Sequence, residues 1–152
     1  MAVSGLGSGI GVTLSSGDTT TSAVETTYSD IISVGLQSGN TDITDISSAS
    51  SASQCAEFLP GLVDAGYFTC VLRYGASGTG AETEVGTLKS TFLARTINEW
   101  VLTIPGGASG GTWTCDGYIV KLGQAVNYQN GVQISFVIRL TGVPVWAVAA
   151  AT

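Results

Sequence analysis

The clearest pattern along this chain is an alternation of apolar and polar side chains over residues 132–142, in which Val137 is the one large apolar side chain on the otherwise polar face. Successive side chains of a β-strand point to opposite faces, so an alternation of this kind predicts a strand with one buried face. Gln133, Ser135 and Arg139 fall on the opposite, polar face. The predicted buried positions of this core strand are Ile134, Phe136, Ile138 and Leu140.

Four further segments have the β-branched or alternating character of strands. They cover residues 28–36, 67–74, 98–104 and 113–122. A glycine-rich turn over residues 105–111 separates the last two of them. Together with the core strand, these segments predict a sheet whose members follow one another along the chain.

One segment has the period of a helix. In residues 82–95, the apolar side chains of Val85, Leu88 and Phe92 recur at i, i+3 and i+7 and form a single stripe. Glu82 and Glu84 in the first turn and Arg95 in the last turn suit the helix dipole. The whole order predicts a mainly β fold: an antiparallel β-sandwich or barrel with one packed α-helix and a long inter-strand loop.

Segments without clear periodicity lie at both ends of the chain. Residues 1–27 are rich in glycine, serine and threonine, which predicts an extended N-terminal arm. Residues 145–152 are interpreted as a C-terminal tail, which leaves residues 28–144 as the β domain. The N-terminus lacks the basic and apolar stretches of a signal peptide. The apolar residues 143–151 are too few to span a bilayer.

The long loop covers residues 37–54 and carries only two large aliphatic side chains, Ile43 and Ile46. They stand in a near-repeat, Thr41-Asp42-Ile43 followed by Thr44-Asp45-Ile46. Ordering a residue costs roughly 1–2 kcal/mol, and so polar a segment buries little apolar surface to offset that cost. We therefore expect the loop to be structureless and mobile in an isolated subunit.

Charge and composition exclude several classes of function. The 152 residues include 11 acidic and 5 basic side chains, a net charge of −6, and only 11 % of them are charged. So acidic a protein is a poor nucleic-acid binder, because phosphate contacts need lysine and arginine. The chain has no histidine, which excludes histidine-based triads, histidine-ligated zinc and histidine general bases. A hydroxyl-rich, weakly charged surface suits a protein that packs against copies of itself.

Several short motifs resemble catalytic or ligand-binding sequences but have a structural interpretation. Residues 107–111 match G-x-S-x-G but join two predicted strands, so we expect a hairpin and not a nucleophile elbow. The glycines of residues 5–9 lack the strand and lysine of a phosphate loop. Cys55, Cys70 and Cys115 are widely spaced and odd in number, which favours free buried thiols. We expect no cofactor.

Three alternatives stay open. Asp42 and Asp45, with the hydroxyls around them, are a possible cation site. Glu99 and Asp116 are a possible pair of catalytic carboxylates. The aromatic side chains are a possible sugar-stacking face, which would make the chain a carbohydrate-binding or adhesive β-sandwich decoration domain. These aromatic residues are Trp100, Trp113, Trp146, Tyr67, Tyr74, Tyr118 and Tyr128.

A resemblance goes further than these patterns. Residues 57–66 read Glu57-Phe58-Leu59-Pro60-Gly61-Leu62-Val63-Asp64-Ala65-Gly66. This resembles the E-F-L-P-G-L-x-D-A-G segment of major tail (tail tube) proteins of long, non-contractile-tailed bacteriophages. Matching pieces follow in order: the helix, Ile104-Pro105-Gly106, the strand at Trp113 and a closing Thr141-Gly142-Val143-Pro144. The resemblance covers residues 31–144 and leaves both ends of the chain without an equivalent.

The resemblance implies a structural, non-enzymatic virion protein, made in the host cytoplasm and located in the tail. It implies hexameric rings of this chain, stacked into a tube through which the genome is ejected. It further implies partners among the tail proteins (tape measure, tail terminator, distal tail), no membrane, and DNA that passes an acidic lumen without specific binding. The segment Thr41, Asp42, Ile43, Thr44, Asp45 and Ile46 falls where such proteins carry a ring-stacking loop.

Overall fold

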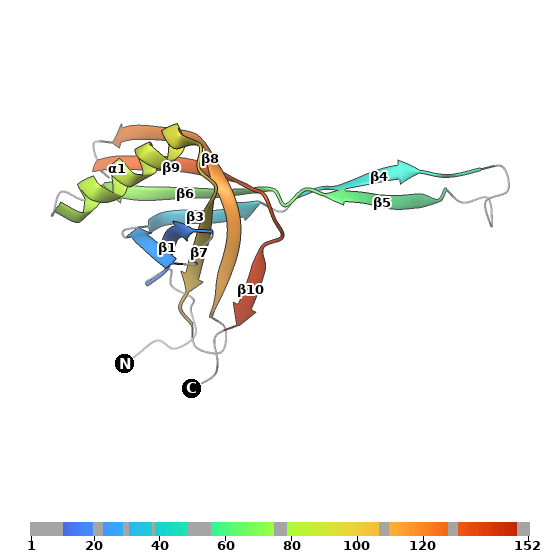
Figure 1. Ribbon diagram of the computed structural model, residues 1–152, viewed down its shortest axis with the longest axis horizontal. Coiled ribbons are helices and arrows are strands. Elements are labelled where there is room, and N and C mark those ends of the chain that lie inside the picture. Colours follow the sequence, from blue (N-terminus) through green and yellow to red (C-terminus); the bar gives the residue numbers. More distant parts are fainter. Residues whose placement is uncertain are drawn as a thin grey trace.

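The computed structural model describes residues 11–19, 23–28, 31–37, 39–48, 56–74, 79–106, 110–127 and 131–148. Within these ranges the chain is mainly β, with one helix (Figure 1). The elements in chain order are β1 (Thr13–Asp18), β2 (Ala23–Tyr28), β3 (Ile31–Gln37), β4 (Thr41–Asp45), β5 (Phe58–Val63), β6 (Tyr67–Tyr74), α1 (Thr79–Ala94), β7 (Asn98–Ile104), β8 (Gly111–Asn127), β9 (Gly131–Leu140) and β10 (Val145–Val148). The prediction of a mainly antiparallel β fold with one packed helix is confirmed.

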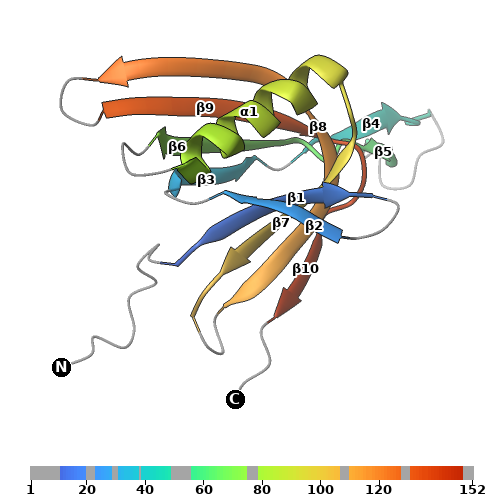
Figure 2. The same ribbon diagram turned by 60° about the vertical axis from the view of Figure 1, so that its left-hand side comes forward.

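One large sheet forms the body of the molecule. Its strand order is β2-β1-β7-β8-β9-β6-β3, with β10 also paired to β8, and these strands all pair antiparallel. Strand β8 is the longest and belongs to both halves: its first part pairs with β7 and β10, and its second part pairs with β9. A register shift between Ile119 and Lys121 marks a bulge where β8 bends between the two halves (Figure 2).

The core lies between the two halves of this sheet and under α1, which packs against β8 and β2. Its centre is aromatic: the rings of Tyr28, Trp100 and Phe136 lie 6.0–6.3 Å apart between centroids. Their polar atoms are satisfied, because the hydroxyls of Tyr28 and Ser16 share a 2.9 Å hydrogen bond and the Trp100 indole N–H donates to the Gly117 carbonyl. The structure buries all four positions of the core strand, Ile134, Phe136, Ile138 and Leu140.

The helix presents the expected stripe to this core. Leu88 is fully buried, and Val85 and Phe92 are partly buried against the same cluster. Arg95, however, lies just beyond the helix and not in its last turn, with a φ of 55°. Its N–H still donates to the carbonyl of Phe92 at 3.3 Å, so Arg95 ends the helix in a left-handed conformation.

The prediction of an extended arm over residues 1–27 is wrong for residues 13–18 and 23–27, which belong to β1 and β2. Strand β1 sits inside the sheet, between β2 and β7. Leu14 is fully buried, and the next inward position is Ser16, whose hydroxyl bonds to Tyr28. Since a serine replaces the second apolar residue, β1 has no visible alternation. Residues 1–10 lie outside the described residues.

The tail predicted over residues 145–152 is also partly a strand. Residues Val145–Val148 form β10, which pairs with the first part of β8. The indole rings of Trp146 and Trp113 contact each other with centroids 5.0 Å apart. The main sheet therefore extends beyond residues 28–144 in both directions. Four residues with alternation too short to recognise are enough to add a strand when the neighbouring strand offers a free edge.

The long loop is not structureless. Residues Thr41–Asp45 form β4, which pairs antiparallel with β5 in a separate two-stranded sheet. The segment Phe58–Val63, expected as the lead into the next strand, is itself a strand of this ribbon. The polar strand β4 is hydrogen-bonded to β5, which contains residues 58–63 of the E-F-L-P-G-L-x-D-A-G segment. The periodicity of the sequence does not reveal this pairing. Residues 49–55 of the predicted loop lie outside the described residues.

The described cysteines should be unreactive in the native protein. Burial raises the pKa of Cys70 to about 12, and burial with the nearby charges of Asp116 and Glu99 raises that of Cys115 to about 11. The thiolate is the reactive form, so alkylation of both at pH 8 should be at least ~100-fold slower in the native state than in denaturant. Peptide mapping after iodoacetamide treatment measures this, and equal labelling in the two states would contradict it.

A candidate assembly surface on the β4–β5 arm

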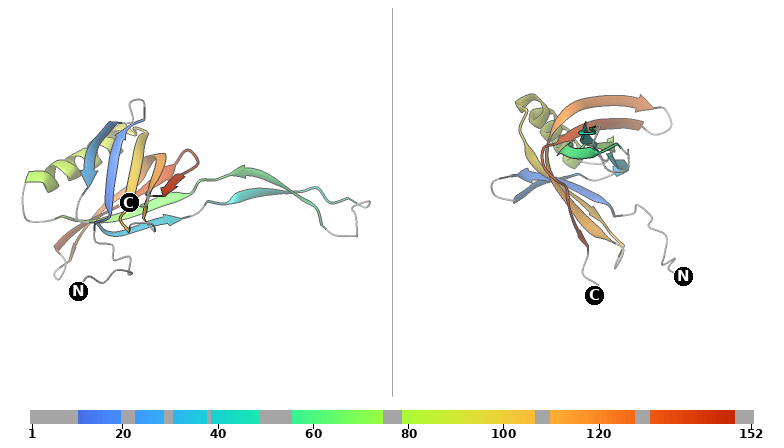
Figure 3. Two further views of the ribbon diagram at one scale, coloured as in Figure 1. Left: turned by 90° about the horizontal axis from the view of Figure 1, so that it is seen from below. Right: turned by 90° about the vertical axis from the view of Figure 1, so that its right-hand side faces the viewer.

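The ribbon of β4 and β5 projects from the body as an arm, defined here as residues 39–48 and 56–63 (Figures 1 and 3). The ladder continues past both strands, with the Ile46 N–H donating to Glu57 and the Asp64 N–H to Asn40. At the base of the arm the two backbone segments approach each other closely, because a Cβ on Gly39 would collide with the carbonyl oxygen of Asp64. Glycine is therefore required where the arm leaves the body.

The arm exposes an unusual amount of apolar surface. Leu62 is 88 % exposed and Ile43 is 64 % exposed, and the other large apolar side chains of the arm are exposed as well: Ile46, Phe58, Leu59 and Val63. Ile43 pairs with Pro60, while its neighbour Thr44 pairs with Leu59, so both faces of the ribbon carry apolar groups. An isolated two-stranded ribbon is only marginally stable in water, and exposed apolar patches of this kind mark interaction sites.

The ring-stacking positions predicted from the sequence all lie on this arm. Thr41, Asp42, Ile43, Thr44 and Asp45 form β4, and Ile46 follows directly. The carboxylates bond to their own backbone: Asp42 accepts from the Ile43 N–H at 3.1 Å, and Asp45 from the Ser47 N–H at 2.8 Å. The hydrogen bonds from Ser47 lower the pKa of Asp45. In the part of the chain that the structure describes, no three residues of metal-binding type gather, so nothing here supports the cation alternative.

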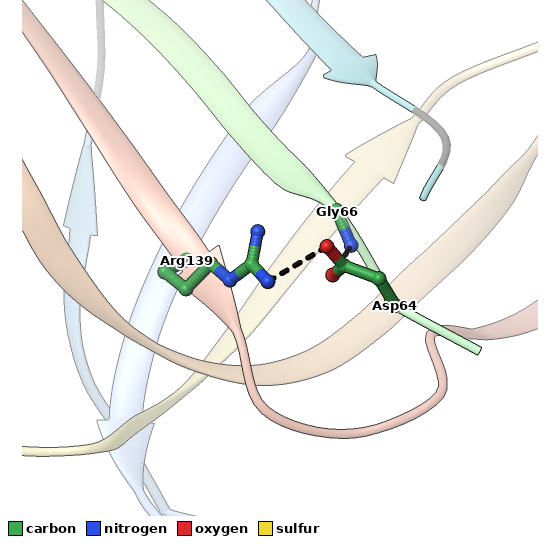
Figure 4. A network of polar contacts seen from close by, with 3 residues as sticks. All are labelled: Asp64, Gly66 and Arg139. Carbon is green, nitrogen blue, oxygen red and sulfur yellow. Dashed lines mark hydrogen bonds and ion pairs between the residues drawn. The ribbon is translucent and has the colours of Figure 1, made fainter. Parts of the chain in front are cut away.

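A polar cluster joins the arm to the body (Figure 4). Asp64 follows β5 directly, and its carboxylate accepts a hydrogen bond from the Gly66 N–H at 2.9 Å and from the Arg139 guanidinium at 2.7 Å. The Arg139 guanidinium also lies 4.5 Å from the centre of the Tyr67 ring. The hydrogen bond from Gly66 and then that from Arg139 lower the pKa of Asp64. These contacts tie the end of β5 to β6 and β9.

The lowered pKa of Asp64 sets a testable pH dependence. A group whose pKa is lowered by folding stabilises the fold above its ordinary pKa, and this contribution is lost as the pH falls through the folded value. The NMR shift of the Gly66 amide should therefore titrate with a midpoint below about 3.9, the ordinary aspartate value. Asp64→Asn should abolish this titration and Arg139→Gln should raise its midpoint, with Asp116→Asn as the control that leaves it unchanged. A midpoint at or above about 3.9 in the wild type would contradict these hydrogen bonds to Asp64.

The other candidate residues that the structure describes lie on strands of the body, outside the arm. Glu99 and Asp116 face each other as partners across β7 and β8. Trp100 is buried in the core, and Trp113 is partly buried and packs against the more exposed Trp146. The glycines of residues 5–9, residues 107–109 of the G-x-S-x-G pattern, Cys55 and Tyr128 lie outside the described residues. No helix in the described ranges is long and apolar enough to cross a membrane.

The sequence patterns did not single out two residues of the polar cluster around Asp64, namely Arg139 and Tyr67. Arg139 was assigned only to the polar face of its strand, and Tyr67 only to a strand. The family-motif residues Phe58, Leu59, Pro60, Gly61 and Leu62 lie in β5, Glu57 precedes it, and Asp64 and Gly66 form the turn into β6. The D-A-G sequence was the available signal, because an aspartate whose side chain bonds to the backbone two residues on marks a tight turn.

Comparison with known proteins places the fold. No protein-family model and no curated protein matches this sequence. Among solved structures, the chain is similar to one from the tail of an empty gene transfer agent particle with C6 symmetry (TM-score 0.62, 15 % identity, 90 % of this chain and 95 % of that one). It is also similar to a chain of the SPP1 tail tube (0.57, 12 %, 91 % and 76 %). A third is a chain of the sheath–tube complex of an extracellular contractile injection system, PVC (0.64, 10 %, 91 % and 88 %). The chain has the fold found in these tail and tube assemblies.

Proposed function

We propose that this chain is the structural subunit of a phage-type tail tube, which assembles into hexameric rings stacked as a conduit for genome ejection. The observation that carries the proposal is a tail-tube fold bearing a projecting arm with exposed apolar groups on both faces. The C6 symmetry of the similar gene transfer agent tail supports the ring number. In this role the chain is not an enzyme and works in the tail of the virion.

The arm is the ring-to-ring contact in this proposal. Its apolar groups have no cover within the described body, and docking on an adjacent ring would remove them from water. A heterologous contact of this kind, repeated from ring to ring, generates a filament. Tape measure, terminator and distal tail proteins would meet the same surfaces at the tube ends. Similar chains occur in structures of a sheath/tube terminator and of a tube-terminating cap.

Negative-stain electron microscopy of the purified protein, paired with size-exclusion chromatography, tests the proposal. We expect rings, or tubes whose wall is about one subunit thick. They should form spontaneously or after the protein concentration is raised. A protein that stays monomeric under all conditions and binds to a glycan array would instead favour the adhesive alternative.

A further inference from the structure

We propose that the arm of one copy docks into a groove at the C-terminal end of α1 on a second copy, with Asp42 and Asp45 facing Arg95 and Lys121. This inference rests on the proposed function and names the surface that receives the arm. It follows from where the chain places its charges and its exposed apolar groups.

Acidic and basic side chains are segregated along the sequence. All five basic residues come after residue 72: Arg73, Lys89, Arg95, Lys121 and Arg139. The arm has none, and its described part carries Asp42, Asp45 and Glu57. A surface that receives the arm should therefore be basic as well as apolar, since like charges brought together at an interface cost several kcal/mol.

The groove at the end of α1 meets both requirements. It measures about 380 Å³ and is lined by Phe92, Leu93, Arg95, Tyr118, Ile119 and Val120. Leu93 is 77 % exposed, and Val120 and the nearby Ile97 are exposed as well. Arg95, which ends the helix, brings a positive charge into the lining, and Lys121 follows Val120 at the bulge of β8. Both basic side chains are exposed.

Among the other grooves of the described body, one lined by Val85, Lys89, Leu122 and Ile134 also carries a positive charge, but its volume of about 130 Å³ is about a third of that at the end of α1. Two further grooves have no unpaired positive charge. The groove beside β3 is lined by apolar residues and one serine, among them Ile32, Leu36 and Trp113. The groove between the end of β5 and the segment that follows β9 includes Val143 and the Asp64–Arg139 pair, whose charges cancel. Charge complementarity and size together therefore select the groove at the end of α1.

The arm that fills the groove belongs to another copy. The arm points away from the body on the side opposite to α1, so its own groove lies out of reach (Figure 1). A contact between different surfaces of two copies is heterologous, and it agrees with the head-to-tail stacking proposed above.

Charge reversal tests the pairing. Asp42→Arg with Asp45→Arg should reduce the yield of sedimentable tubes about tenfold or more, because it places four positive charges together. Adding Arg95→Glu and Lys121→Glu to the same chain should restore the yield to within about twofold, because the pairing is then merely inverted. The matched control adds Arg73→Glu and Lys89→Glu instead, and it should restore nothing.

The outcomes separate this inference from the proposed function. If the arm reversal abolishes tubes and the substitutions at Arg95 and Lys121 do not restore them, or the control substitutions at Arg73 and Lys89 restore them equally well, the arm is an assembly contact that docks elsewhere, and the inference is overturned. If arm reversal leaves tubes intact, the role of the arm itself is wrong. If the protein forms no tubes in any form, the proposed function fails.

A second measurement uses the unaltered protein and does not depend on how variants fold. A carbodiimide joins a carboxylate to a lysine amine in direct contact, and the chain has two lysines, Lys89 and Lys121. Mass spectrometry of treated tubes should find Asp42 or Asp45 linked to Lys121 between subunits. Links from these aspartates to Lys89, with none to Lys121, would overturn the proposal.

Discussion

Replacing Ile43 and Ile46 by serine should abolish tube assembly while leaving the isolated subunit folded. Both side chains are exposed in the subunit and lie on an arm that contributes nothing to the core. Burying an isoleucine contributes about 1.5–3 kcal/mol, so losing two such contacts weakens each ring-to-ring contact by about 3 kcal/mol or more. That is roughly a hundredfold in the association constant of one contact, and a stacked ring repeats the contact in every subunit.

The measurement is the sedimentable fraction together with electron microscopy, and far-UV circular dichroism checks the fold. Val126→Ser is the matched control, because Val126 is 80 % exposed on β8, away from the arm. Hydrogen exchange gives an independent reading: amides of the arm should be more protected in tubes than in free subunits. Normal tube assembly by the double variant, or equal hydrogen exchange of the arm in tubes and free subunits, would contradict the proposed stacking role of the arm.

Phe136→Ala should destabilise the subunit by about 3–5 kcal/mol, the usual cost of removing a large aromatic side chain from a core. Phe136 is 1 % exposed at the centre of β9, with its ring centroid 6.0 Å from that of Trp100 and 6.3 Å from that of Tyr28. Its loss opens a cavity among rings that rigid strands hold apart, so the site has little freedom to collapse. For a chain of this length the melting temperature should fall on the order of 10 °C.

Chemical denaturation of the monomer gives the free energy of unfolding directly. Ser135→Ala is the control on the neighbouring, exposed position of the same strand, and its effect should stay within about 0.5 kcal/mol. An unchanged unfolding midpoint for Phe136→Ala would show that the core strand is wrongly assigned. The two pairs of variants also separate folding from assembly, because the arm and the core share no buried residue.

The elements that can be predicted from the amino-acid sequence are those whose pattern is local. The alternation of residues 132–142 predicted a strand, and the i, i+3, i+7 stripe of Val85, Leu88 and Phe92 predicted the one helix, because both patterns follow from the geometry of a single element. The E-F-L-P-G-L-x-D-A-G segment pointed to the tail-tube fold that the solved structures share.

The elements whose partners are distant along the chain can be identified only in the folded protein. Strand β1 alternates Leu14 with an inward Ser16, and that serine is acceptable only because Tyr28 satisfies its hydroxyl. Strand β4 is polar throughout except for Ile43 and becomes a strand because β5 supplies its hydrogen bonds. Asp64 and Arg139, 75 positions apart, meet only when β5, β6 and β9 converge. Pairing between segments distant in sequence leaves no period in either of them, so the arm and its anchor appear only when the chain is folded.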